Sequence, residues 1–74
     1  MIMEITYHGH NTIELNPGDL IRYQLVSGVW NYMGTFIDVL PPLPHRGNVR
    51  WIRVLTQDGL QKLNTATIFR MEKQ

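Results

Sequence analysis

The residue types in this chain that could do chemistry begin with two histidines, His8 and His10, on either side of Gly9. In an extended segment, side chains two residues apart point to the same face, so this pair could supply two ligands of a metal site. A protein zinc site needs at least a third ligand, and no spacing ties the candidates Glu14 and His45 to the pair. We therefore expect two polar residues around a glycine turn, and no metal centre.

Nucleophile and phosphate-binding motifs are missing from the sequence. The chain has no cysteine, its single serine is Ser27, and no Gly-rich loop of the Walker or dinucleotide type occurs. An active site needs several such groups converging in one concave pocket. The sequence therefore predicts a protein that is not an enzyme and that holds no cofactor.

Aromatic and arginine side chains are the stronger signal, because Trp, Tyr and Arg dominate the binding energy of protein interfaces. If Ile52 and Val54 face the core of a strand, alternation turns Trp51 outward. Either the N-terminal segment covers that tryptophan or another molecule does. We predict that the chain docks a protein partner or a second copy of itself, through Trp30, Tyr32, Trp51 and Arg53.

The formal net charge of +1 conceals an asymmetry between the two parts of the chain. Residues 1–45 hold one basic residue against four acidic ones, and residues 46–74 hold six against two. Nucleic-acid binding is therefore the alternative, with aromatic side chains stacking on bases. The small net charge argues against high affinity, because affinity grows with the number of phosphates neutralised. The candidate nucleic-acid-binding residues are Arg46, Arg50, Lys62 and Arg70.

Turn chemistry and alternation divide the chain into short strands that position these side chains. Pro17-Gly18 and Asp58-Gly59 are strong turn signals, and the prolines from Pro41 to Pro44 cannot donate to a sheet. We read that proline run as a stiff loop rather than as a Pro-rich ligand. The predicted strands span 19–25, 32–40, 49–56, 60–63 and 68–71, with a helical turn at 64–67.

This order of strands resembles the SH3-like small barrels, including their KOW and Tudor-like members. The resemblance rests on Pro17 to Arg22, Trp30 to Ile37, Arg53 to Gly59 and Leu63 to Ile68. It implies an all-β fold: a five-stranded barrel over 17–74, with an N-terminal strand or hairpin extension over 1–16. It also implies a groove between Trp30, Tyr32 and the Pro41 to His45 loop. Similar barrels are common among short bacteriophage proteins, so a small phage or bacterial accessory protein is expected.

A weaker likeness is to the type B dihydrofolate reductases, which are SH3-like barrels that work as tetramers. Gln61 matches the pore glutamine of that family, after matching residues in 18–22 and 27–30. Lys62 and Leu63 stand where the family has an Ile-Tyr pair, and the pore lysine falls near Gln24 or Leu25. A reductase-like enzyme therefore remains a remote alternative.

The N-terminal segment is too apolar for a disordered tail. We predict that it packs as an added strand or hairpin, on the outer face that carries Trp51 or across a subunit boundary. A chain of 74 residues buries only about 60% of its surface, so oligomerisation is a plausible supplement. No apolar run reaches the ~20 residues of a membrane span, and residues 1–14 contain no Lys or Arg, unlike a signal peptide. The expected location is the cytoplasm, or the virion if the protein is phage-encoded.

Overall fold

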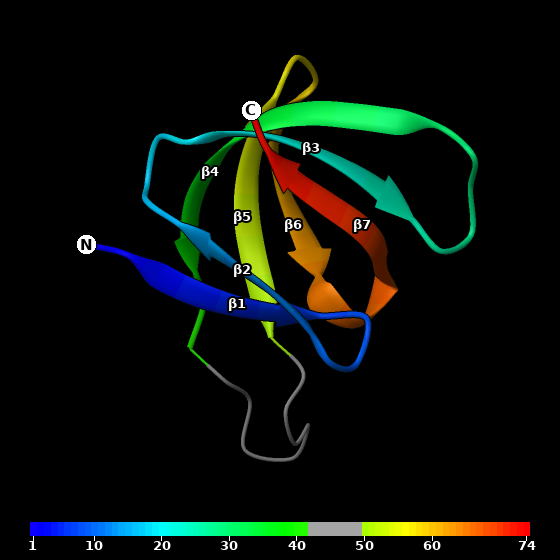
Figure 1. The fold of residues 1–74 in the computed structure, drawn as a ribbon. Coiled ribbons are helices and arrows are strands. Elements are labelled where there is room, and N and C mark those ends of the chain that lie inside the picture. The colour runs from blue at the N-terminus through cyan, green and yellow to red at the C-terminus, as the bar shows by residue number, and fades with distance from the viewer. Residues whose placement is uncertain (42–49) are drawn as a thin grey trace.

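The computed structural model describes residues 1–41 and 50–74, which form two antiparallel sheets (Figure 1). A two-stranded hairpin comprises β1 (Met3–Tyr7) and β2 (Asn11–Leu15). The second sheet has the order β6-β5-β4-β3-β7. Its strands are β3 (Leu20–Leu25), β4 (Asn31–Val39), β5 (Trp51–Thr56), β6 (Gly59–Asn64) and β7 (Ile68–Lys73).

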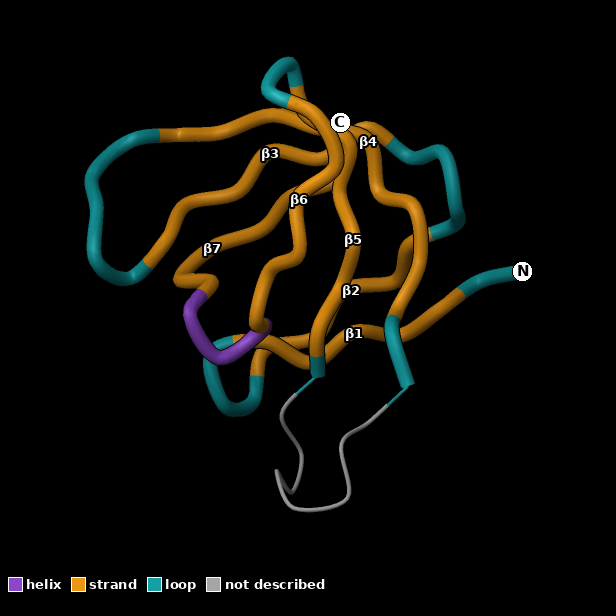
Figure 2. Tube along the Cα trace, turned by 180° about the vertical axis from the view of Figure 1, so that it is seen from behind, coloured by secondary structure: helices purple, strands orange, loops and turns teal. Residues whose placement is uncertain are grey.

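The predicted all-β class and the N-terminal hairpin are confirmed. Within the described residues the five-stranded sheet is not closed into a barrel. Its two edge strands do not pair with each other: β6 pairs with β5, and β7 pairs with β3. A single 3-10 turn, η1 (Thr65–Thr67), connects these two edge strands within the described residues. Figure 2 shows this turn next to the turn of the β1–β2 hairpin, and the amide of His8 donates to the Thr65 carbonyl at 3.3 Å.

Two glycine turns set the positions of the strands. Gly18 has a φ of +97°, a conformation that favours glycine, and its amide donates to the Phe36 carbonyl at 2.7 Å. Gly59 has a φ of +106° in the β5–β6 turn, where the Thr56 hydroxyl donates to the Gly59 carbonyl at 3.1 Å. Both turns occur where Pro17-Gly18 and Asp58-Gly59 predict them.

Strand boundaries shift by small amounts from the predicted ones. The last strand continues to Lys73 rather than ending at Met71, because β3 pairs with it as far as Ile21 opposite Lys73. The Asn64 side chain accepts from the amide of Ala66 at 2.9 Å and so caps the predicted turn. The proline loop from Pro42, and the predicted strand start at Val49, lie outside the described residues.

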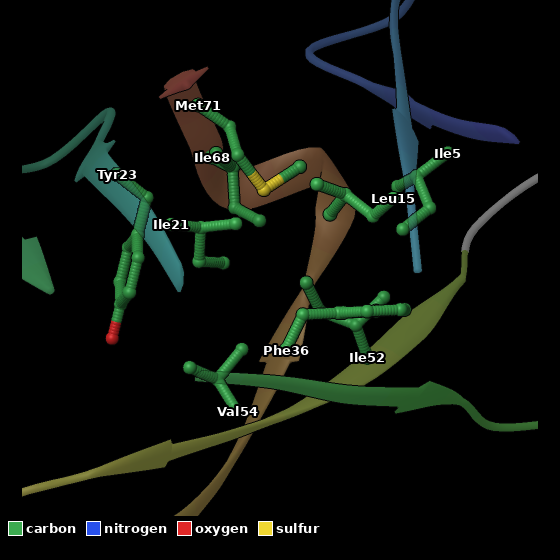
Figure 3. Close-up of a cluster of buried hydrophobic side chains, with 9 residues drawn as sticks. All are labelled: Ile5, Leu15, Ile21, Tyr23, Phe36, Ile52, Val54, Ile68 and Met71. Atoms are coloured by element: carbon green, nitrogen blue, oxygen red, sulfur yellow. The ribbon is translucent and has the colours of Figure 1, made fainter. Parts of the chain in front are cut away.

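One hydrophobic core joins the two sheets (Figure 3). Ile52 and Val54 are fully buried, as alternation predicts. The cluster consists of Ile5, Leu15, Ile21, Tyr23, Phe36, Ile52, Val54, Ile68 and Met71.

The predicted position of the N-terminal segment on the face of Trp51 is wrong. Ile5 and Leu15 pack into the interior with Ile52, on the other face of β5. The reason is that the five-stranded sheet alone leaves one end of its interior uncovered, and burying a large aliphatic side chain contributes about 1.5–3 kcal/mol. Ile2 stays 63% exposed, so not every apolar residue of the segment takes part.

Candidate protein-binding site

The β3–β4 loop carries the most exposed aromatic side chain among the described residues. Its base is fixed, because the amide of Val26 donates to the Thr67 carbonyl at 2.9 Å and that of Gly28 donates to Leu25 at 3.2 Å. Val29 and Trp30 follow these anchors and are 81% and 71% exposed. A large apolar pair held in water by an anchored loop is a candidate contact surface.

Tyr32 stands beside this loop and stacks on Tyr23. The two residues are direct cross-strand partners, their ring centroids are 5.5 Å apart, and the rings are inclined by 21°. Tyr23 is buried, whereas Tyr32 is 41% exposed. Burial, with a smaller contribution from Tyr32, raises the pKa of Tyr23, so its phenol is neutral at neutral pH. The pair therefore offers one face of an aromatic stack to solvent.

A pocket of about 520 Å³ opens in front of this stack. We call it the open-end pocket, since it lies at the end of the sheet interior that the N-terminal hairpin does not cover. Leu25 and Leu63 contribute apolar surface, and Asn31, Gln57 and Gln61 contribute amides. Its lining residues are Tyr23, Leu25, Asn31, Tyr32, Met33, Thr56, Gln57, Asp58, Gln61 and Leu63.

The charge of the open-end pocket restricts what it can bind. Asp58 is the one charged side chain among the lining residues, and none of them is Lys, Arg or His. A phosphate group would find no cation there, whereas an apolar or hydrogen-bonding side chain would find aromatic surface and amides. The arrangement combines apolar surface with a few polar groups, as ligand-binding pockets do.

Trp51 and Arg53 lie apart from Trp30 and Tyr32. Trp51 begins β5, whereas Tyr32 lies near the opposite end of that strand, beside Thr56 in the open-end pocket. Five residues of strand correspond to about 17 Å. The four predicted partner-binding residues thus form two pairs. Trp30 and Tyr32 lie at the open end of the sheet interior, and Trp51 and Arg53 lie on the outer face of the sheet.

Arg53 forms a salt bridge with Asp38. Its Nε donates to Asp38 Oδ1 at 2.7 Å, and a second guanidinium nitrogen donates to Oδ2. The hydrogen bond from Arg53 lowers the pKa of Asp38, and the same bond raises the pKa of Arg53. Because both side chains are about one third exposed, solvent screens this pair.

The described candidates for nucleic-acid binding are dispersed. Lys62 is exposed on β6 and Arg70 is exposed on β7, the two opposite edges of the sheet. Arg70 lies over the Phe69 ring at 5.9 Å. Arg50 lines a different pocket of about 420 Å³, which also contains His8. Arg46 lies outside the described residues.

Sequence reasoning missed the amides and Leu63 as parts of one pocket. From the sequence, Gln61 was singled out only through the likeness to the reductases, and Gln57 was not singled out. The sequence does contain one signal for this pocket, which is the position of Tyr23 and Tyr32 on either side of one loop. Aromatic residues that flank a hairpin loop become cross-strand neighbours when the register brings them opposite each other.

The histidine pair takes the structural role expected of it. His8 adopts a φ of +50° in the β1–β2 turn, and its ring meets Phe69 edge-on at 5.4 Å between centroids. In the part of the chain that the structure describes, no three His, Asp or Glu side chains gather in a way that could hold a metal ion. Within the same residues, no helix has the length and hydropathy needed to cross a bilayer.

Comparison of the chain with models of protein families, with curated protein sequences and with solved structures finds no significant match. The function must therefore be inferred from the geometry.

Proposed function

We propose that the chain is a non-enzymatic interaction module that docks a protein partner, with the β3–β4 loop and the open-end pocket as its binding surface. The observation that carries this proposal is the pocket walled by the Tyr23–Tyr32 stack, together with Trp30, which is 71% exposed and directly precedes the lining residue Asn31. An exposed tryptophan beside a preformed apolar pocket is the usual anatomy of an interface hot spot.

The proposal includes a fold assignment to the SH3-like small barrels. The order β6-β5-β4-β3-β7, with a 3-10 turn before the last strand, supports it. In that family the sequence resemblance implied a groove between Trp30, Tyr32 and the Pro41 to His45 loop. The open-end pocket is lined by Tyr32 but not by Trp30, and it borders the β5–β6 turn. A role as a small phage or bacterial accessory protein is part of the same proposal, and the strand pattern is what supports it.

Charge favours a protein partner over a nucleic acid at this surface. A nucleic-acid site needs cations along the path of the phosphates. The residues that line the open-end pocket provide one carboxylate and no cation, and Lys62 and Arg70 lie on opposite edges of the sheet. An extended peptide with apolar side chains satisfies both the aromatic stack and the amides of Asn31, Gln57 and Gln61.

Selection of short peptides from a random displayed library tests the proposal. Peptides selected on the wild-type protein are expected to bind Trp30→Ala and Tyr32→Ala at least about tenfold more weakly, a loss typical of a hot spot. Trp51→Ala is the matched control, since Trp51 lies at the other end of β5. Unchanged melting temperatures would show that the variants are folded.

Four results would overturn the proposal. Selection could give no peptide at all, or the selected peptides could bind Trp30→Ala and Tyr32→Ala as well as they bind the wild type. Salt-sensitive binding of oligonucleotides that Arg50→Ala, Lys62→Ala or Arg70→Ala weakens would favour the nucleic-acid alternative. Oxidation of NADPH by dihydrofolate, lost in Gln61→Ala, would favour the reductase-like alternative.

A further inference from the structure

Three leucines form a row across the outer face of the five-stranded sheet. The register places Leu20 opposite Thr35, Thr35 opposite Leu55, and Leu55 opposite Leu60. Their neighbours in sequence Ile21 and Val54 are buried in the core, so alternation turns the row outward. We call Leu20, Leu55 and Leu60 the leucine row.

The leucine row is exposed to an unusual degree. Leu20, Leu55 and Leu60 are 44%, 49% and 53% exposed, and Met33, on the same face, is 49% exposed. Single exposed leucines are ordinary on protein surfaces. Apolar residues aligned on adjacent strands form a continuous patch instead, and such patches mark interaction sites. The N-terminal hairpin gives no cover here, because Ile5 and Leu15 enter the core on the opposite face.

Charged residues of both signs border the leucine row. On one side, Asp38 pairs with Arg53 across β4 and β5. On the other side, Arg22 lies on β3, and Asp58 lies in the turn that follows β5. Arg22 is exposed and donates to the Gln74 side chain at 3.3 Å, and no contact joins it to Asp58.

We infer that this face binds a second copy of the chain, through a two-fold axis parallel to the strands and between β4 and β5. Such an axis exchanges β4 with β5 and β3 with β6. It brings Leu20 against Leu60 of the second copy and Thr35 against Leu55 of the second copy. A two-fold contact is self-complementary in this way by construction.

The same two-fold axis places charged residues of one copy opposite residues of the other sign on the second copy. Asp38 faces Arg53 of the second copy, and Arg22 faces the β5–β6 turn with Asp58 of the second copy. Each of these four charges therefore meets one of opposite sign without any change in strand position. The proposed contact shares Met33 and Asp58 with the lining of the open-end pocket, whereas Tyr23 and Leu63 of that pocket lie on the other face of the sheet.

The size of the chain fits such a dimer. A stable interface buries about 800 Å² on each partner, which is roughly one sixth of the 5087 Å² of accessible surface here. A domain of this length also gains most from an added apolar contact, because it buries a small share of its own surface.

Mass measurement on the full chain by sedimentation or light scattering gives the first test. We expect a particle of twice the 8.7 kDa of one chain at about 100 µM, with dissociation on dilution. Leu55→Lys is expected to raise the dissociation constant at least about tenfold, since it buries an unpaired charge in the contact. Val26→Lys is the control, because Val26 is also 49% exposed and lies in the β3–β4 loop.

A charge exchange tests the arrangement itself. R22E and D58R are each expected to be monomeric, because each places like charges opposite one another in the proposed contact. An equimolar mixture of the two is expected to form a heterodimer, in which both contacts are again complementary. Circular dichroism spectra equal to the wild type would show that both variants are folded.

The inference would be overturned by a wild-type protein that stays monomeric at about 1 mM. A dimer that Leu55→Lys leaves intact would equally overturn it. So would R22E and D58R variants that dimerise as well as the wild type, or that stay monomeric when mixed.

Discussion

The interior of the five-stranded sheet has two ends, and the chain treats them differently. At one end the β1–β2 hairpin covers the core with Ile5 and Leu15, both almost fully buried. At the other end no strand of the described residues covers it, and Tyr32 stays 41% exposed beside the open-end pocket. The covered end is part of the hydrophobic core, whereas the open end is the binding surface that we propose.

Removal of the hairpin should have the largest effect on stability. Deleting residues 1–14 removes Ile5 and exposes Leu15, with an expected loss of several kcal/mol and a fall in melting temperature of more than about ten degrees. Thermal unfolding followed by circular dichroism measures this. A truncated protein with the same melting temperature as the full chain would show that the covered end contributes nothing to stability.

A single core truncation at the covered end should cost less than the deletion. Leu15→Ala should destabilise the protein by about 2–5 kcal/mol, the usual cost of a cavity left by a buried leucine. Ile2→Ala is the matched control on the same segment, since Ile2 is 63% exposed and should change stability by less than about 0.5 kcal/mol. Urea unfolding gives both values, and equal losses would contradict the assignment of Leu15 to the core.

Among the described glycines, Gly34 has the least room for a side chain. A Cβ atom there would lie 2.4 Å from Val54 Cγ1 and 2.9 Å from the Leu55 carbonyl oxygen. Gly34→Ala should therefore cost about 1–3 kcal/mol through overpacking. Gly28→Ala is the control, because the nearest atom to its Cβ is 4.0 Å away. Equal stabilities of the two variants in urea would refute the predicted clash.

The turn that joins the hairpin to the sheet should give the smallest, pH-dependent effect. Asp19 accepts from the amide of Asn16 at 2.7 Å, and this bond, with Lys73 3.4 Å away, lowers the pKa of Asp19 below 3.8. A lowered pKa means that the ionised carboxylate stabilises the folded state above pH 3.8 and that this contribution disappears as the pH falls through the folded-state value.

The matched variant is Asp19→Asn. Its melting temperature should be slightly below that of the wild type at pH 6, and the gap should close at about pH 2. A gap that widens towards low pH would reverse the sign of the predicted linkage.

The sequence predicted where the strands and turns lie better than it predicted which side chains of each strand face the core. Pro17-Gly18 and Asp58-Gly59 are local signals, and the turns occur where those residues predict them. The direction in which the side chains of β4 point could not be predicted, because a register shift between Phe36 and Asp38 breaks the alternation of inward and outward side chains. Without that bulge, Asp38 would share the inward face of Phe36; with it, Asp38 reaches Arg53.

The candidate site was predicted in part for a related reason. Exposure of Trp30 agrees with its place in a loop, but the separation of Trp30 from Trp51 depends on which end of β4 meets which end of β5. The open-end pocket depends on the registers of β3, β4, β5 and β6 together. A single sequence carries no direct record of these long-range pairings.

The separation of the two tryptophans also makes the protein its own spectroscopic probe. The chain contains two tryptophans, Trp30 in the solvent-exposed loop and Trp51 half-buried at the start of β5. A soluble quencher such as acrylamide should reach the indole of Trp30 faster than that of Trp51. Occupation of the open-end pocket would then shift the emission of one indole while the other reports the integrity of the sheet, so binding and unfolding can be followed separately without any label.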